Sequence, residues 1–175
     1  MYITIVSLLN TASSITALLA PWAIEEFNDP SKKDDTITLW DIDEVMKPKH
    51  KEGIQVPYLE FKSIMGLMYC VVILSLFALL ATYLAENMKL FSWKVTVGIN
   101  FIEFVTSLSV IVLYALNSDD IHDKNDSIKP YFAGFIFTVI SMSLSMSVFA
   151  LGIKEHIYLN KKSQSVGFFG AGKKY

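Results

Sequence analysis

Four long stretches with almost no charge constrain this chain more than any other feature of its sequence. Three of them carry no charged residue, and the fourth carries only Glu103. The stretches run from Met1 to Ile24, Ser63 to Ala85, Val95 to Ser118 and Pro130 to Ile153. An α-helix needs about 20 apolar residues to cross the hydrocarbon core of a bilayer. The sequence therefore predicts an all-α membrane protein, a bundle of four transmembrane helices over about 3–24, 62–86, 92–117 and 130–157.

We interpret the first stretch as a membrane span and not as a secretory signal. A signal peptide has a basic start and a short apolar core, whereas this stretch has no lysine before it and is longer. Its last residues include Pro21, which helps to end the helix. Trp22 follows, and we expect its amphipathic ring to lie at the membrane interface.

The distribution of lysine predicts how the chain is oriented. The turn Glu86–Lys94 has two lysines and one acid, and the segment Lys154–Tyr175 has five lysines and one acid. The segment Glu25–Lys62 has ten acids against six lysines, and Ser118–Lys129 has four against two. Because lysine-rich short loops stay in the cytoplasm, we expect both termini on the cytoplasmic (or equivalent) side. The acidic loops 25–61 and 118–129 then lie outside.

The first outer loop and the C-terminal segment carry weaker signals. In the first outer loop, Asp35–Val45 alternates in a β-like pattern around Trp40, and Gly53–Phe61 follows after turn residues. This pattern predicts a small β-hairpin. Residues 158–175 are rich in glycine, serine and lysine, which is typical of a flexible basic tail. Phe168 and Phe169 lie between its lysines and are candidates for docking on a lipid surface or a neighbouring subunit.

Small and hydroxyl-bearing residues recur on one face of two of the predicted spans. Small residues let helices approach closely, and hydroxyls can bond across the interface. We therefore interpret these faces as packing surfaces of the bundle, with a hydrophilic permeation path as the alternative. The stripe in the first span is Ser7, Thr11, Ser14, Ala17 and Pro21, and the one in the fourth span is Gly134, Thr138, Ser141, Ser145 and Gly152.

Glu103 is the residue that most needs an explanation. It is nine residues past Lys94, about 14 Å along a helix and so near the middle of the membrane. Asn100 and Ser107 lie on the same helical face. Since a charged acid at this depth is costly, we expect Glu103 to be protonated and hydrogen-bonded inside the bundle. A contact with a partner protein and a proton or ion relay remain the alternatives.

The sequence carries no motif of a catalytic, cofactor or metal site. Its one cysteine, Cys70, cannot form an intramolecular disulfide or a Cys-x-x-Cys metal site. The chain has no nucleophile elbow, phosphate loop or HExxH motif. We expect a protein that is not an enzyme, with no cofactor and no metal. The partners expected are the lipid bilayer and other membrane subunits or a second copy, and not nucleic acid.

The layout resembles that of the claudin and peripheral-myelin-protein-like tetraspan superfamily. The residues that carry the resemblance are "APWAI" at the exit of the first span and "TLW" (Thr38–Trp40) in the loop after it. The resemblance implies a left-handed four-helix bundle with a small sheet on its outer face. The chain departs from the family pattern because it lacks the loop cysteine pair and has threonine where the Gly-Leu-Trp motif has glycine.

The resemblance implies a non-catalytic role in adhesion, barrier formation or modulation of a larger channel. Without the disulfide, an accessory or structural subunit fits better than a junction former, and the plasma membrane is the favoured location. The alternative is a supernumerary subunit of an energy-transducing complex, for instance in the mitochondrial inner membrane. A small transporter or channel that uses Glu103 is a weaker alternative.

Overall fold

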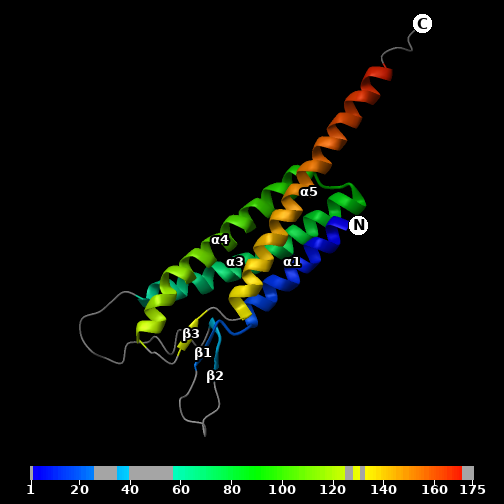
Figure 1. Ribbon diagram of the computed structural model, residues 1–175. Helices are drawn as coiled ribbons and strands as arrows, with labels where there is room; N and C mark the ends of the chain where they lie inside the picture. The colour runs from blue at the N-terminus through cyan, green and yellow to red at the C-terminus, as the bar shows by residue number, and fades with distance from the viewer. Residues whose placement is uncertain (1, 26–34, 40–56, 125–127, 131–132, 171–175) are drawn as a thin grey trace.

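The computed structural model describes residues 2–25, 35–39, 57–124, 128–130 and 133–170. Its long helices are α1 (Tyr2–Leu19), α3 (Pro57–Tyr83), α4 (Trp93–Lys124) and α5 (Ala133–Gly170) (Figure 1). They contain four segments long and apolar enough to cross a membrane, namely Tyr2–Leu19, Ser63–Met88, Trp93–Asn117 and Ala133–Lys162. The predicted four-span, all-α architecture of an integral membrane protein is confirmed.

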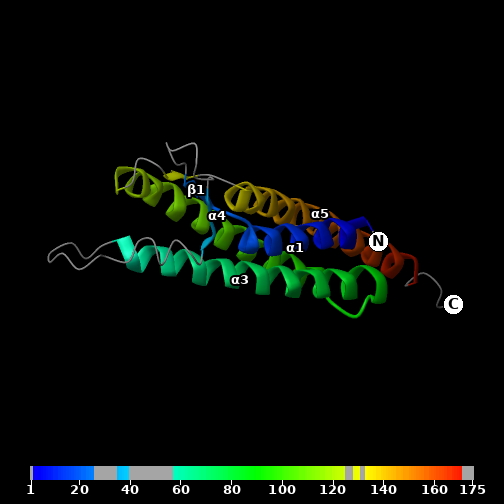
Figure 2. The ribbon, with the colours of Figure 1, turned by 90° about the horizontal axis from the view of Figure 1, so that it is seen from below.

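The helices form a bundle in which neighbouring helices run in opposite directions. Both α1 and α4 pack against α3 and against α5, so α1 and α4 lie diagonally across the bundle. The start of α1 and the start of α4 meet in one apolar cluster, so these two helices are parallel. Both termini lie at this end, and the strands lie at the other end of the bundle (Figures 1 and 2).

Two helix ends differ from the sequence prediction. The first span ends at Leu19 and not at residue 24, because Pro21 cannot donate a backbone hydrogen bond and disfavours helical geometry in the residue before it. Helix α5 continues to Gly170, so most of the predicted flexible tail 158–175 is helical. The sequence from Lys154 to Lys162 contains good helix formers and no proline or glycine, which lets the helix run on beyond the span.

The end of α3 is tied to the start of α1. A π-helical turn, η1 (Leu84–Met88), closes α3, and Lys89 ends it in a left-handed conformation with φ 54°. The Glu86 carboxylate in this turn accepts hydrogen bonds from the backbone N–H groups of Ile3 at 3.3 Å and Thr4 at 2.8 Å. The first N–H groups of a helix have no partner within it and carry partial positive charge. Glu86, which the sequence analysis did not single out, therefore caps α1.

A small antiparallel sheet covers the other end of the bundle. It consists of β1 (Ala23–Glu25), β2 (Asp35–Ile37) and β3 (Ile128–Pro130), with β1 in the middle. The sheet thus joins the exit of α1 to the segment just before α5. Pro130 fits in β3 because this strand has a neighbour on one side only.

The prediction of a β-hairpin is wrong for the second of its two strands. Strand β2 begins the run Asp35–Val45 as expected, but it pairs with β1. Residues from Pro57 onward belong to α3. Proline is favoured at the first position of a helix because its missing N–H would have no partner there, so Pro57 suits the start of α3. Residues 40–56, including Trp40, lie outside the described residues.

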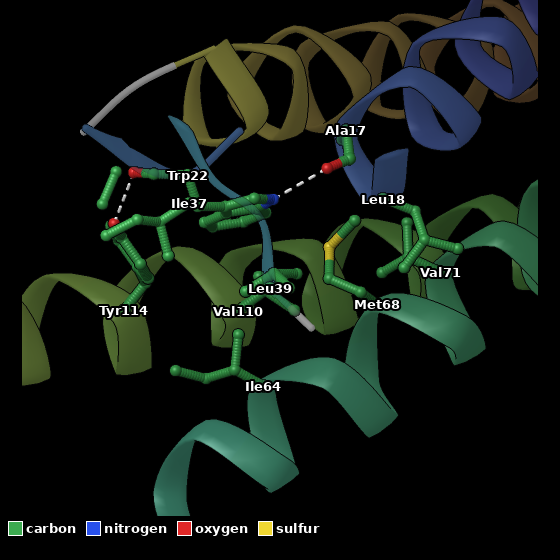
Figure 3. Close-up of a cluster of buried hydrophobic side chains, with 11 residues drawn as sticks. Ala17, Leu18, Trp22, Ile37, Leu39, Ile64, Met68, Val71, Val110 and Tyr114 are labelled. Carbon is green, nitrogen blue, oxygen red and sulfur yellow. Dashed lines mark hydrogen bonds between the residues drawn. The ribbon is translucent and has the colours of Figure 1, made fainter. Parts of the chain in front are cut away.

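Trp22 joins the sheet to the bundle. Its side chain is fully buried, and its ring lies edge-on to Tyr114 of α4, with centroids 4.8 Å apart. The indole N–H donates to the Ala17 carbonyl at 2.8 Å, and the Tyr114 hydroxyl donates to the Trp22 carbonyl at 2.6 Å (Figure 3). The Trp22 backbone N–H donates to the Ile37 carbonyl at 2.8 Å. Trp22 is therefore a core residue and does not lie at the lipid interface as we predicted.

Gly134 allows α5 to approach this indole. Its backbone N–H donates to the Pro21 carbonyl at 2.7 Å. A Cβ atom at position 134 would lie 2.2 Å from Trp22 Nε1 and 2.3 Å from Trp22 Cδ1. Real carbon atoms do not come this close, so only glycine fits the contact.

We expect Gly134→Ala to lower the stability of the bundle by about 1–3 kcal/mol, the usual cost of overpacking a core. The measurement is the thermal unfolding midpoint of the purified protein in detergent. The matched control is Gly98→Ala, since a Cβ at position 98 meets nothing within 4 Å. Equal midpoints for the two variants would contradict the tight contact with Trp22.

Candidate functional site

A buried polar layer crosses the middle of the bundle. Its side chains come from three helices, and all of them are fully buried. We define the polar layer as Ser7, Asn10 and Ser14 of α1, Thr96, Asn100, Glu103 and Ser107 of α4, and Ser141 and Ser145 of α5. The layer contains one carboxyl group and no basic residue.

Hydrogen bonds within the layer connect α1, α4 and α5. The Asn10 side-chain amide donates to Glu103 Oε1 at 2.7 Å, across the diagonal of the bundle. The Ser141 hydroxyl donates to Asn10 Oδ1 at 2.8 Å. Ser14 Oγ lies 2.7 Å from Ser141 Oγ, within hydrogen-bond distance. Asn10 thus uses its donor and its acceptor to bridge two helices, which is how polar side chains stabilise helix association in a membrane.

The parallel register of α1 and α4 shows which residues lie at the same height. Asn10 and Glu103 are 93 positions apart and meet in one hydrogen bond. Parallel helices have the same rise per residue, so the offset between residues at one height stays nearly constant. Ser7 therefore lies level with Asn100, one turn from the Asn10–Glu103 bond. Ser14 and Ser107 lie level with each other one turn away on the other side.

Five side-chain oxygens in the layer have no hydrogen-bond partner among the described residues. They are Ser7 Oγ, Thr96 Oγ1, Asn100 Oδ1, Glu103 Oε2 and Ser107 Oγ. Four of them belong to one face of α4, where the residues follow 4-3-4 spacing. A buried polar group without a partner costs about 1–3 kcal/mol, so this concentration needs an explanation beyond helix packing.

Apolar clusters lie on both sides of the polar layer along the bundle. Toward the termini, Ile3, Ala85, Trp93 and Val148 pack together. Toward the sheet, a larger cluster surrounds Trp22 (Figure 3). It includes Ala17, Leu18, Ile64, Met68, Val71, Val110 and Tyr114. The polar layer is thus closed at both ends by apolar side chains, and it does not extend as a hydrophilic path from one end of the bundle to the other.

The outer surface of the helices differs from the buried polar layer. Large apolar and aromatic side chains are exposed along all four spans, as in Leu8, Phe77 and Ile102. Hydroxyls on this surface bond to their own helix, as Thr106 does to the Ile102 carbonyl at 2.8 Å and Ser109 to the Val105 carbonyl at 2.9 Å. Such a surface suits hydrocarbon, because each polar group there is satisfied internally.

The structure brings together most of the predicted site residues. Glu103, Asn100, Ser107, Ser141 and Ser145 all belong to the polar layer. The predicted packing stripes of the first and fourth spans also face inward, with the exception of Pro21, which is only half-buried. The burial of Glu103 agrees with a hydrogen bond inside the bundle and excludes a direct contact between Glu103 and a partner in this conformation.

The remaining predicted residues lie elsewhere. Trp22 belongs to the cluster beneath the sheet. Trp40 is outside the described residues, and Phe168 and Phe169 are described only as part of the α5 backbone. Among the residues that the structure describes, no group of three or more metal-ligating His, Cys, Asp or Glu side chains occurs.

Sequence reasoning missed two members of the layer, Thr96 and Asn10, and Asn10 is the one that bonds across the bundle. It is the only amide in the first span and continues the stripe of that span with a spacing of three residues from Ser7 and four to Ser14. This spacing could have identified it. Its partner could not have been found, because the diagonal contact depends on how the helices are arranged.

The chain has no significant match to any protein-family model, curated protein or solved structure.

We expect Asn10 and Glu103 to be energetically coupled. Asn10→Leu and Glu103→Leu should each destabilise the bundle by about 1–3 kcal/mol, since each leaves a buried partner unsatisfied. The double variant should be more stable than the sum of the two losses predicts, by about 0.6–2 kcal/mol. Glu103→Gln keeps an acceptor for Asn10 and should be tolerated. The measurement is unfolding in detergent.

The control for this cycle is Thr106→Val, which removes a hydroxyl from the outer surface of the same helix. Its effect should add to that of Asn10→Leu without coupling. Strictly additive losses for Asn10→Leu and Glu103→Leu would show that the bond across the bundle contributes nothing to stability.

Proposed function

We propose that this chain is a non-catalytic tetraspan protein that serves as a structural or accessory subunit of a larger membrane assembly, with an architecture like that of the claudin and peripheral-myelin-protein superfamily. The observation that carries the proposal is the sheet fixed to the end of the bundle by Trp22. The Ile37, Trp22 and Tyr114 hydrogen bonds connect strand, loop and helix in one buried cluster. A sheet held in this way offers a rigid surface outside the membrane.

The interior of the bundle supports the same proposal. The polar side chains of the layer bond to one another between helices, and the outer surface of the spans is apolar. Polar groups that face inward and join helices are typical of a structural framework. The bundle needs no second protein to cover Glu103, so partner contacts are expected at the sheet end or at the apolar helix surfaces.

We further propose that both termini lie on the cytoplasmic (or equivalent) side and that the plasma membrane is the location. The termini lie at one end of the bundle and the sheet at the other (Figure 1). The excess of lysine at the terminal end supports this orientation. The sheet then faces outward.

Two other functions remain as alternatives. A supernumerary subunit of an energy-transducing complex would have the same bundle in a different membrane with different partners. A small transporter that uses Glu103 is supported by the unpartnered oxygens of the polar layer. The apolar clusters at both ends of the layer favour the structural role over an open channel.

The test is site-specific photo-crosslinking in the native membrane. A photoreactive residue at Thr36, in the edge strand β2, should give one discrete product of higher mass, because a fixed edge strand presents unpaired backbone groups to a partner. A photoreactive residue at Ile102, on the outer surface of α4, serves as the control and should react mainly with lipid.

The identity of the cross-linked protein separates the alternatives. A plasma-membrane channel or adhesion protein would support the proposal, and a respiratory subunit would favour the energy-transducing alternative. No protein product at either position would contradict a role as a subunit.

A further inference from the structure

We propose that the terminal end of the bundle binds the headgroups of anionic phospholipids through a basic rim, which we define as Lys89, Lys94 and Lys154. This inference goes beyond the proposed role as a subunit and does not depend on it, because lipids surround the chain with or without protein partners. It starts from the turn between η1 and α4, where exposed apolar side chains alternate with lysines.

This turn exposes apolar side chains at the point where two spans meet the membrane surface. One candidate span ends at Met88 and the next begins at Trp93. Between them, Leu90 is 74% exposed, and Phe91 and Met88 are exposed as well. Apolar surface of this kind is unfavourable in water, whereas at the boundary between headgroups and acyl chains it is buried in lipid. The turn therefore suits the headgroup boundary of a bilayer.

Lys89 and Lys94 lie at this boundary. Lys89 directly follows η1, and Lys94 is the second residue of α4. Ala85 of η1 and Trp93 of α4 pack in one cluster, so the end of η1 and the start of α4 lie at a similar height. Both lysines are exposed. The two ammonium groups therefore flank the apolar turn at the level of the headgroups.

Lys154 joins the basic rim from α5. A Cβ atom at Gly152 would lie 3.0 Å from Val97 Cγ2 and 3.7 Å from Trp93 Cε3, so Gly152 is level with the first turn of α4. Lys154 is two residues further toward the terminal end, about 3 Å along the helix, and it is exposed. Three lysines from η1, α4 and α5 thus lie near one height.

The charge at this end is positive and complements an anionic leaflet. The segments Glu86–Lys94 and Lys154–Lys162 hold five lysines and two acids. Of the two acids, Glu86 accepts from the first N–H groups of α1, and Glu155 is half-buried. Lysines clustered beside a membrane span attract anionic lipids. Each ammonium group acts as a point charge without a fixed fork geometry, which suits mobile phosphate headgroups.

Helix α5 carries further lysines away from the membrane. It runs on past the other three long helices (Figure 1), and every residue from Ile157 to Lys162 is exposed. Lys161 is seven residues beyond Lys154, about 10 Å along the helix. The attraction to a charged leaflet falls off within a Debye length, about 8 Å at physiological salt. Lys161 and Lys162 therefore contribute less than the basic rim.

The test uses the purified full chain in vesicles of phosphatidylcholine with a minor fraction of phosphatidylglycerol. Cys70→Ser removes the one native cysteine, and Asn87→Cys then allows a fluorophore to be attached in the exposed turn. Quenching by spin-labelled phosphatidylglycerol, relative to spin-labelled phosphatidylcholine, measures the local enrichment of anionic lipid. We expect an enrichment of about fivefold at low salt, the factor for one lysine near a charged leaflet, and a smaller one at high salt.

Two sets of variants locate the site. Replacement of all three lysines of the basic rim by glutamine should abolish the enrichment at position 87. The matched control removes the same charge from the sheet end and should keep the enrichment; it replaces Lys62 of α3, Lys124 of α4 and Lys129 of β3 by glutamine.

A second labelling position tests the other end of the bundle. Leu116→Cys, also made in the Cys70→Ser background, places the fluorophore on an exposed position near the end of the α4 span. Because Leu116 lies far from the basic rim, its fluorophore should be quenched equally by the two lipids.

Four results would overturn the proposal. Equal quenching by both lipids at position 87 would show that the chain does not select anionic lipid. Enrichment that survives loss of the basic rim, or that is the same at position 116, would place its cause elsewhere. Quenching by neither lipid at position 87 would mean that a second copy of the chain covers the turn. Enrichment lost on adding inorganic phosphate, but not chloride of equal ionic strength, would indicate a site for free phosphate.

Discussion

The hydrogen bond between Asn10 and Glu103 is the interaction on which the interior of this bundle depends. It joins the two helices that share no extended packing surface, α1 and α4, across the diagonal. In hydrocarbon a carboxyl group must find its partners within the protein, so the bond fixes the rotation of both helices about their axes. Ser141 extends the contact to α5 through Asn10 Oδ1. The serines around this bond leave room for two long polar side chains to meet.

The two ends of the bundle are held by different means. At the terminal end, the Glu86 carboxylate caps α1 and so joins the start of the first helix to the end of α3. At the sheet end, the indole of Trp22 fills the space between α1, α4 and α5 and carries β1 with it. Gly134 makes this possible by removing the side chain that would collide with the ring. Polar contacts thus fix the centre and one end, and aromatic packing fixes the other end.

Hydrogen bonds between helices account for only part of the polar layer. Its hydrogen-bonded half, made by Asn10, Ser14 and Ser141 around Glu103 Oε1, accounts for helix association. Its other half, with the unpartnered oxygens of α4 and Ser7, is not accounted for by packing.

The sequence by itself determined the number of spans and their approximate limits, because a membrane requires about 20 apolar residues per helix. It also indicated the inward faces of the first and fourth spans, because hydroxyl stripes at helical spacing mark the interface. It also identified Glu103, Asn100 and Ser107 as one face. It could not give the partner of Glu103, since Asn10 is 93 positions away and its contact depends on the parallel, diagonal placement of α1 and α4. The pairing of β1 with β2 and β3, the cap at Glu86 and the burial of Trp22 were likewise decided by the tertiary structure. Short strands and single side chains carry too little local signal, and their partners are chosen by which segments the bundle brings together.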